Sequence, residues 1–198
     1  MKADGTKRYV LDLRRFNKHV VKNTYPLPIP QDQFDRLHGA KWFISLDAIQ
    51  GFLQRMLDAK SRLKMAFTTP DGKFCMNRLP FGFINSPGEF QNMMDDILGV
   101  LRYTIVLVYI DDVLVYAGTF EELLRRFILV LQRAQQFGLM FKLKKCKFGF
   151  QEIEFLGLKI IRTFMSLGDC NLAYRGFPRN SKIFEKMISS IGMDVKYT

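Results

Sequence analysis

Tyr109-Ile110-Asp111-Asp112 is the stretch that decides the fold, because it sets two adjacent carboxylates between two apolar, β-branched runs. The runs, Thr104–Val108 and Val113–Tyr116, both predict buried strands. Asp111 and Asp112 are therefore expected side by side in the tight turn of a hairpin. Like charges this close raise each other's pKa unless a cation neutralises them, and oxygen ligands of this kind suit Mg²⁺ or Mn²⁺. The alternative is an ordinary hairpin turn, in which Asp is a favoured residue.

A third carboxylate strengthens the case for a metal site. Lys41–Leu46 is another strand-like run, and it is followed directly by Asp47. If these strands are neighbours in one sheet, Asp47 and Asp111 converge at a single edge. Three carboxylates around two divalent cations suit in-line phosphoryl transfer, in which one metal activates the attacking oxygen and the other stabilises the leaving pyrophosphate.

Short segments with a recognisable order run from residue 2 to about residue 160. They are Lys2–Arg8, Leu11–Arg14, Asn17-Lys18, Tyr25–Pro28, Ser45–Phe52, Leu79–Pro87 with Phe90-Gln91, Tyr109–Asp112, Lys145–Gly149 and Glu154–Gly157. In this order they resemble the fingers and palm of a reverse transcriptase, most like those of gypsy-type long-terminal-repeat retrotransposons and their Pol polyproteins. Each segment is weak evidence alone, except Tyr109–Asp112, but the ordered set is specific.

The resemblance implies an RNA-directed DNA polymerase, a nucleotidyltransferase that uses two Mg²⁺ (or Mn²⁺) ions. Such an enzyme transfers nucleotides from deoxynucleoside triphosphates to a primer 3′-hydroxyl on an RNA or DNA template. Asp47 and Asp111 would hold both metals, Asp112 would be the third carboxylate, and the Ala48 carbonyl would be an extra ligand. For Asp112, neutralisation by a nearby lysine is a serious alternative.

Five positions correspond in the resembling enzymes to the nucleotide site. Lys2 and Arg8 would clamp the triphosphate, and the alternative for each is a solvated basic strand end. Phe52 would lie under the sugar and exclude a 2′-hydroxyl, whereas its alternative is a core phenylalanine. Phe81 and Gly82 would line the same pocket.

The remaining positions fall on the primer–template side of the site. The resemblance places Pro87 and Gln91 against the template, Tyr109 and Ile110 at the primer terminus, and Phe155, Leu156 and Gly157 in the hairpin that holds the primer. A helix start explains Pro87 by itself, and an ordinary edge strand is the alternative for the last three.

The order of elements predicts an α+β fold, with an antiparallel split βαβ (ferredoxin-like) sheet and helices on one face. The resemblance makes this the palm of a right-hand polymerase with its fingers. Outside the strands named above, the predicted elements run as follows. They are a strand over 8–13, an extended connector over 25–30, a helix over 31–38, a hairpin around Pro70–Gly72 and further strands over 139–143 and 155–160.

Two helices are predicted from capping boxes. Ser86–Glu89 starts the first, with Pro87 in its first turn, and Thr119–Glu122 starts the second, which ends at Gly138. The second helix is expected to bury Leu123, Phe127, Val130, Leu131, Ala134 and Phe137.

The pattern divides the chain into fingers and palm over residues 1–160, with the N-terminal fingers incomplete, and a divergent tail over 161–198. The tail is expected to be a loop plus a short helix, without a thumb. Two other functions therefore stay open beside the polymerase core. One is a non-catalytic nucleic-acid-binding remnant of a retrotransposon polymerase, and the other is a domesticated protein-interaction module.

Charge and composition narrow the class of partner. The 198 residues are 48% hydrophobic, and 30 Lys and Arg against 19 Asp and Glu give a net charge of +11, which favours a polyanionic partner. No apolar run is long enough to span a bilayer and no signal peptide is expected. The three cysteines lack C-x-x-C spacing, so we expect no zinc site but an intracellular, reducing setting in cytoplasm or nucleus. No feature of the sequence predicts the oligomeric state.

Overall fold

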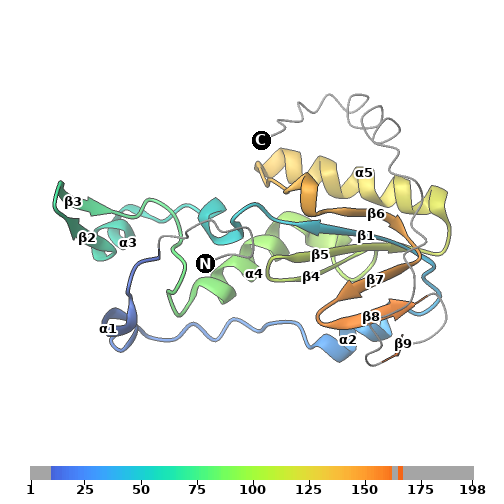
Figure 1. Ribbon diagram of the computed structural model, residues 1–198, viewed down its shortest axis with the longest axis horizontal. Coiled ribbons are helices and arrows are strands. Elements are labelled where there is room, and N and C mark those ends of the chain that lie inside the picture. The colour runs from blue at the N-terminus through green and yellow to red at the C-terminus, as the bar shows by residue number, and fades with distance from the viewer. Residues whose placement is uncertain (1–9, 162–164, 167–198) are drawn as a thin grey trace.

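Four antiparallel strands form the central sheet of the computed structural model, which describes residues 10–161 and 165–166 (Figure 1). In spatial order they are β4 (Val106–Tyr109), β5 (Asp112–Ala117), β1 (Trp42–Asp47) and β6 (Lys147–Phe150). Because β1 lies between strands that come much later in the chain, the order is that of a split βαβ sheet. The predicted fold class is therefore confirmed.

Both faces of this sheet are covered, so its strands are almost continuously apolar. The long helices α4 (Ser86–Leu98) and α5 (Phe120–Phe137) pack on one face, against side chains that include Ile44 and Val113. The opposite face, with Phe43 and Leu114, packs on the short helix α2 (Pro30–Asp35) and on a second sheet. Alternate residues of each strand thus enter two different cores.

The second sheet consists of β7 (Glu152–Phe155), β8 (Leu158–Ile161) and β9 (Met165–Ser166). A third, two-stranded unit lies at the far end of the long axis (Figure 1) and is formed by β2 (Ala66–Thr69) and β3 (Gly72–Cys75), next to α3 (Ala59–Lys64). The predicted hairpin around Pro70–Gly72 is therefore confirmed. The remaining short helices are α1 (Arg14–Asn17), η1 (Gly51–Gln54), η2 (Gly99–Leu101) and η3 (Leu143–Lys145).

Two predicted strands are wrong where the structure describes them. Residues 10–13 form no strand and lead instead into α1. Residues 139–143 contribute a single β-bridge, between Ala48 and Phe141, before η3 begins. The segment over 139–143 does pair with the end of β1, since the Ile49 amide donates to the Met140 carbonyl and the Lys142 amide to the Asp47 carbonyl, but the pairing is too short to form a strand.

The helix starts differ from each other. Thr119 caps α5 as predicted, because its Oγ1 accepts a hydrogen bond of 3.2 Å from the Glu122 amide. The capping box at Ser86 is wrong: Asn85 precedes the helix, and the Ser86 hydroxyl donates instead to the Pro80 carbonyl at 2.7 Å. The core position predicted for Phe137 is also wrong, since this residue lies 51% exposed in the last turn of α5.

The connector over residues 21–29 has neither helix nor strand, which confirms the extended segment predicted for 25–30 except at Pro30, where α2 begins. Among the described residues, no helix has the length and apolar content that crossing a membrane requires. The predicted tail helix over 181–191 lies outside the described residues.

Candidate active site

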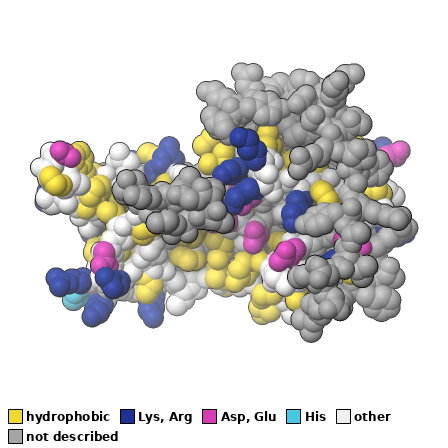
Figure 2. Space-filling view, in the orientation of Figure 1, with side chains coloured by type: hydrophobic (Ala, Val, Ile, Leu, Met, Phe, Trp, Pro, Cys, Tyr) yellow, Lys and Arg dark blue, Asp and Glu magenta, His cyan; other side chains and the backbone are white. Residues whose placement is uncertain are grey.

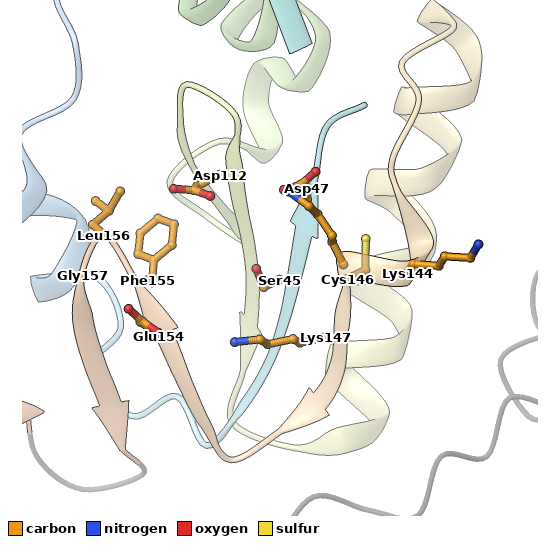
Figure 3. Close-up of a pocket in the computed structure, with 11 residues that line it drawn as sticks. Ser45, Asp47, Asp112, Lys144, Cys146, Lys147, Glu154, Phe155, Leu156 and Gly157 are labelled. Carbon is orange, nitrogen blue, oxygen red and sulfur yellow. The ribbon is translucent and has the colours of Figure 1, made fainter. Parts of the chain in front are cut away.

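The sheet brings two of the predicted carboxylates together. Asp47 is the last residue of β1 and Asp112 the first of β5, and their Cα atoms are direct partners in the antiparallel register. Both line a pocket of about 550 Å³ at the edge of the sheet, together with Ser45 (Figure 3). The edge predicted from the strand pattern therefore exists, although the two residues are distant in sequence.

Basic residues line the same pocket. Lys144, Lys145 and Lys147 line it, and Lys145 Nζ lies 3.1 Å from Asp47 Oδ2. Figure 2 shows Lys and Arg side chains gathered beside acidic ones on this face of the molecule. An ammonium group thus occupies a position where the two facing carboxylates favour positive charge.

The electrostatics of Asp112 reflect this crowding. Partial burial in the pocket wall and the negative charge of Asp47 raise its pKa, whereas the ammonium of Lys145 lowers it. Since repulsion between carboxylates is relieved by a cation, the pair Asp47 and Asp112 fits a divalent metal. Lys145 partly fills the same electrostatic role, which agrees with the alternative proposed for Asp112.

Asp111 has a different orientation from its neighbours. Its Oδ1 is buried, and a Cβ added at Gly51 would collide with this oxygen and come within 2.9 Å of Phe90 Cζ. The absence of a side chain at Gly51 therefore makes room for the Asp111 carboxylate. Asp111 is not among the residues that line the 550 Å³ pocket.

The three carboxylates consequently do not form one cluster in this arrangement. Within residues 10–161 and 165–166, no three His, Cys, Asp or Glu side chains are grouped so that they could hold a metal ion. Two of the three predicted ligands face the pocket, and their convergence with Asp111 stays a prediction. Ala48, the further predicted ligand, is buried beside Asp47 in its bridge with Phe141.

The turn that carries Asp111 is strained and held from both sides. Ile110 has a φ of 54°, a left-handed conformation that costs a non-glycine residue roughly 1–2 kcal/mol. Gln91 on α4 accepts a hydrogen bond of 2.8 Å from the Ile110 amide. Gln33 on α2 donates one of 3.0 Å to the Val108 carbonyl. Both glutamines are fully buried, so packing fixes a backbone conformation that the local sequence disfavours.

These contacts bear on three residues of the site. Gln91 is fully buried, and its side-chain oxygen accepts the hydrogen bond from the Ile110 amide; its contact with a template stays a prediction. Gln33 is a supporting residue that the sequence did not predict, because a polar residue beside Phe34 in a short helix gives no sign of burial. Pro87 lies in the first turn of α4, as its structural alternative predicted.

The aromatic residues predicted for the nucleotide site lie together. The ring of Phe52 in η1 is 5.3 Å from that of Phe81 and 5.7 Å from that of Phe90, measured between centroids. Gly82 has a φ of 84°, and its carbonyl accepts a hydrogen bond of 2.8 Å from Asn17 Nδ2. Phe52 is partly buried and also packs on the helix-side core, as its alternative of a core phenylalanine predicts, and its position under a nucleotide sugar stays a prediction.

Lys2 and Arg8, the other predicted nucleotide ligands, lie outside the described residues. Tyr109 packs against the core on the α2 side of the sheet, and Ile110 against the core on the helix side. Each is only partly buried, so both keep a surface at the end of the hairpin.

The Phe-Leu-Gly stretch forms the far wall of the pocket (Figure 3). Leu156 and Gly157 connect β7 and β8 with φ values of 52° and 76°, the positive pair that a two-residue type I′ turn requires. The edge-strand alternative is therefore wrong for these two residues, because they are a hairpin turn. Phe155 closes β7 and is buried.

Comparisons with known proteins agree with this architecture. The profile of the family described as "Reverse transcriptase (RNA-dependent DNA polymerase)" matches residues 1–160. The enzymatic polyprotein of cauliflower mosaic virus (strain Strasbourg) is 37% identical over 159 residues, which are 80% of this chain and 23% of the polyprotein. The retrovirus-related Pol polyprotein from transposon opus of Drosophila melanogaster is 37% identical over 158 residues, or 79% of this chain and 16% of that protein.

Solved structures give the same result. A foamy viral protease-reverse transcriptase in complex with double-stranded DNA superimposes with a TM-score of 0.75 at 25% identity, covering 100% of this chain and 40% of that one. The foamy viral protease-reverse transcriptase with an RNA/DNA hybrid gives 0.73 at 25% identity, covering 96% of this chain and 29% of the other. The chain thus spans less than a quarter of the curated relatives it matches.

Proposed function

The chain belongs to the reverse transcriptase family, and from that premise we propose that it is the catalytic core of an RNA-directed DNA polymerase. It transfers nucleotides from deoxynucleoside triphosphates to the 3′-hydroxyl of a primer on an RNA or DNA template. The observation that carries this proposal is the pairing of Asp47 with Asp112 at the edge of the sheet. Adjacent carboxylates in an open pocket are poorly placed for stability alone, as the raised pKa of Asp112 indicates, but are suited to binding cations.

Asp47, Asp111 and Asp112 would hold two Mg²⁺ or Mn²⁺ ions, with the Ala48 carbonyl as a further ligand. When bound, the ions supply activation of the primer hydroxyl and neutralisation of the leaving pyrophosphate. To hold a cation, Asp47 would have to be released from its ion pair with Lys145, and Asp111 would have to turn its carboxylate from Gly51 toward the pocket.

Nucleotide selection belongs to the aromatic group beside the turn. Phe52 presents a ring that excludes a 2′-hydroxyl, while Phe81 and Gly82 line the same site and Lys2 and Arg8 bind the triphosphate. Phe52→Val is expected to admit ribonucleotides while leaving deoxynucleotide use largely intact, as measured by competitive incorporation. If Phe52 serves only the core, the substitution instead lowers stability by about 1–4 kcal/mol and leaves sugar preference unchanged.

The primer–template would lie across the pocket between the Asp112 hairpin and the Phe155–Gly157 turn. The foamy viral relatives are structures in complex with double-stranded DNA and with an RNA/DNA hybrid. A net charge of +11 supports the same class of ligand here. Tyr109 and Ile110, at the end of the acidic hairpin, would meet the primer terminus.

Metal-dependent primer extension by the purified chain tests the proposal. Extension is expected with Mg²⁺ or Mn²⁺ and its loss in Asp111→Asn, whereas Asp71→Asn, the same change in the β2–β3 turn, serves as the matched control. Equal activity of the two variants would contradict the catalytic role of Asp111.

A non-catalytic nucleic-acid-binding protein is the second candidate. The observation that favours it is the Asp111 carboxylate, which packs over Gly51 and outside the 550 Å³ pocket. This candidate predicts retained primer–template binding, no extension with either metal, and no difference between Asp111→Asn and wild type.

A further inference from the structure

Asp95 occupies an unusual position for an acidic residue on α4. Its side chain is only 9% exposed, and it lies one helical turn beyond Gln91. Its Oδ1 accepts a hydrogen bond of 2.8 Å from Gln91 Nε2. Its Oδ2 accepts one of 2.6 Å from the Tyr25 hydroxyl and forms an ion pair with Arg102. A buried carboxylate with this many partners is held in one orientation.

The orientation of the Asp95 carboxylate determines the orientation of the Gln91 side-chain amide. An ionised carboxylate only accepts hydrogen bonds, so Gln91 must turn its NH₂ group toward Asp95. The Gln91 carbonyl oxygen is thereby left facing the opposite way, where it accepts from the Ile110 amide at 2.8 Å. Asp95 therefore selects the one amide orientation that can hold the strained turn.

The other end of this chain of hydrogen bonds is the connector over residues 21–29, which runs between α1 and α2 (Figure 1). Tyr25 reaches Asp95 from this connector, and Asn23 fixes it to the start of α4 by donating to Glu89 Oε1 at 2.8 Å. Burial and the neighbouring carboxylate of Asp95 raise the pKa of Tyr25. Tyr25 therefore keeps its proton and stays a donor at neutral pH.

We propose that Asp95 is a positioning residue of the polymerase site, acting through Gln91 on the Ile110 backbone and so on the direction of Asp111. A series of hydrogen bonds from Tyr25 through Asp95 and Gln91 to Ile110 links the connector to the turn that carries Asp111. The consequence for catalysis rests on the proposed function, whereas the effect on the turn does not. Asp95 touches none of the reacting groups, because Gln91 separates it from the turn.

Asp95→Asn and Gln91→Met test the effect on the turn by amide hydrogen exchange, read by NMR. In Asp95→Asn the new side-chain amide can donate as well as accept, so Gln91 is no longer held in one orientation. In Gln91→Met the side chain keeps its length but loses the oxygen that accepts from the turn. Exchange of the Ile110 amide, relative to the amides of β5, is expected to rise by about tenfold or more in both variants.

The matched control is Tyr116→Phe. The Tyr116 hydroxyl bonds to the carbonyls of Tyr103 and Thr104, at the opposite end of the same hairpin. Its loss removes side-chain hydrogen bonds from this hairpin without touching the turn. Unchanged relative exchange of Ile110 in the Asp95 and Gln91 variants, or an equal rise in Tyr116→Phe, would overturn the proposal.

Primer extension then separates this proposal from the polymerase proposal. Asp95→Asn is expected to lower kcat by about 10- to 100-fold through misplacement of the turn, with the KM for deoxynucleotide nearly unchanged. A normal kcat together with faster Ile110 exchange would overturn the catalytic consequence. If the wild-type chain extends no primer, the polymerase proposal fails, while hydrogen exchange and the affinity for Mn²⁺ alone still decide whether Asp95 positions the turn. In that case Mn²⁺ affinity is expected to fall in Asp95→Asn and not in Tyr116→Phe.

Discussion

Two hairpins of this molecule have two-residue loops, but the strands of one are buried and the strands of the other are exposed to solvent. In the palm, Tyr109 pairs with Asp112 around Ile110-Asp111, and in the fingers Thr69 pairs with Gly72 around Pro70-Asp71. Each loop therefore carries Asp at its second position. The strands of the palm hairpin are buried almost throughout, whereas those of the fingers hairpin contain no buried residue.

The difference shows what makes an aspartate turn a candidate metal site. The fingers turn uses residues that suit it locally, since Pro70 fixes φ and Gly72 accepts a φ of 143°. The palm turn carries Ile110 at a φ of 54° and is held by Gln91 and Gln33. The fingers turn is thus an ordinary hairpin turn in which Asp is simply a favoured turn residue. The palm turn differs because the surrounding core fixes its conformation and places it opposite Asp47.

The largest expected effect is on core stability. Leu114 of β5 is fully buried, and Leu114→Ala should cost about 2–5 kcal/mol of unfolding free energy through lost burial and cavity formation. Phe74 of β3 is 48% exposed, and Phe74→Ala should change it by no more than about 0.5 kcal/mol. Urea unfolding measures the unfolding free energy of both variants. Similar losses would mean that the core does not stabilise the palm hairpin more than the fingers hairpin.

A smaller loss of stability is expected at Gly51, where the Asp111 carboxylate packs against the backbone. Gly51→Ala should cost about 1–3 kcal/mol, because the new methyl group collides with Asp111 Oδ1 and crowds Phe90. Gly118→Ala is the control, since its nearest neighbouring atom lies at an ordinary 3.7 Å. Thermal unfolding compares the two, and an equal, small effect would show that Asp111 does not fill the space over Gly51.

The fingers hairpin is expected to bind nucleic acid through its positive charge, and not to bind a metal ion. Lys64 and Lys73 are exposed near it, and each substitution to Ala should lower the slope of log affinity against log salt by about 0.9 if its ammonium contacts a phosphate of duplex DNA. Mn²⁺ affinity should stay unchanged. Fluorescence anisotropy at several salt concentrations measures the slope, and an unchanged slope would remove these lysines from the nucleic-acid interface.

The smallest effect concerns Asp112. Its folded-state pKa is raised, so its ionisation destabilises the fold as the pH rises from the unfolded-state pKa through the folded one. Asp112→Asn removes this penalty and should stabilise the metal-free chain by up to about 0.5 kcal/mol at pH 7, since solvent still screens this partly buried pair. As the pH falls below the unfolded-state pKa of about 3.9, the wild-type carboxyl becomes protonated in both states, and the gain should vanish. A stability loss at pH 7 would indicate that Lys145 already overcompensates the repulsion.

The same contrast explains what the sequence could predict. The apolar runs around Tyr109–Asp112 and before Asp47 predicted a shared sheet edge. Strands that are buried on both faces are nearly continuous apolar runs, which can be recognised in the sequence. The turn sequence Pro70–Gly72 predicted the fingers hairpin through local chemistry alone.

The supporting polar residues could not be predicted in this way. Gln33, Gln91 and Asp95 each form a hydrogen bond with a residue on another element, and no spacing in the sequence predicts such long-range partners. Ser86 gave a false capping signal for the same reason, because its hydroxyl bonds to Pro80 in the preceding loop. Local patterns thus predicted where the acids lie, while long-range hydrogen bonds determine how they are held.

Anomalous diffraction from crystals of the chain with primer–template, deoxynucleoside triphosphate and Mn²⁺ tests the central claim most directly. The account predicts Mn²⁺ peaks in contact with Asp47, Asp111 and Asp112, with the Asp111 carboxylate turned from Gly51 into the pocket. The absence of Mn²⁺ at these residues, or Mn²⁺ held by Asp47 and Asp112 while Asp111 stays against Gly51, would contradict it.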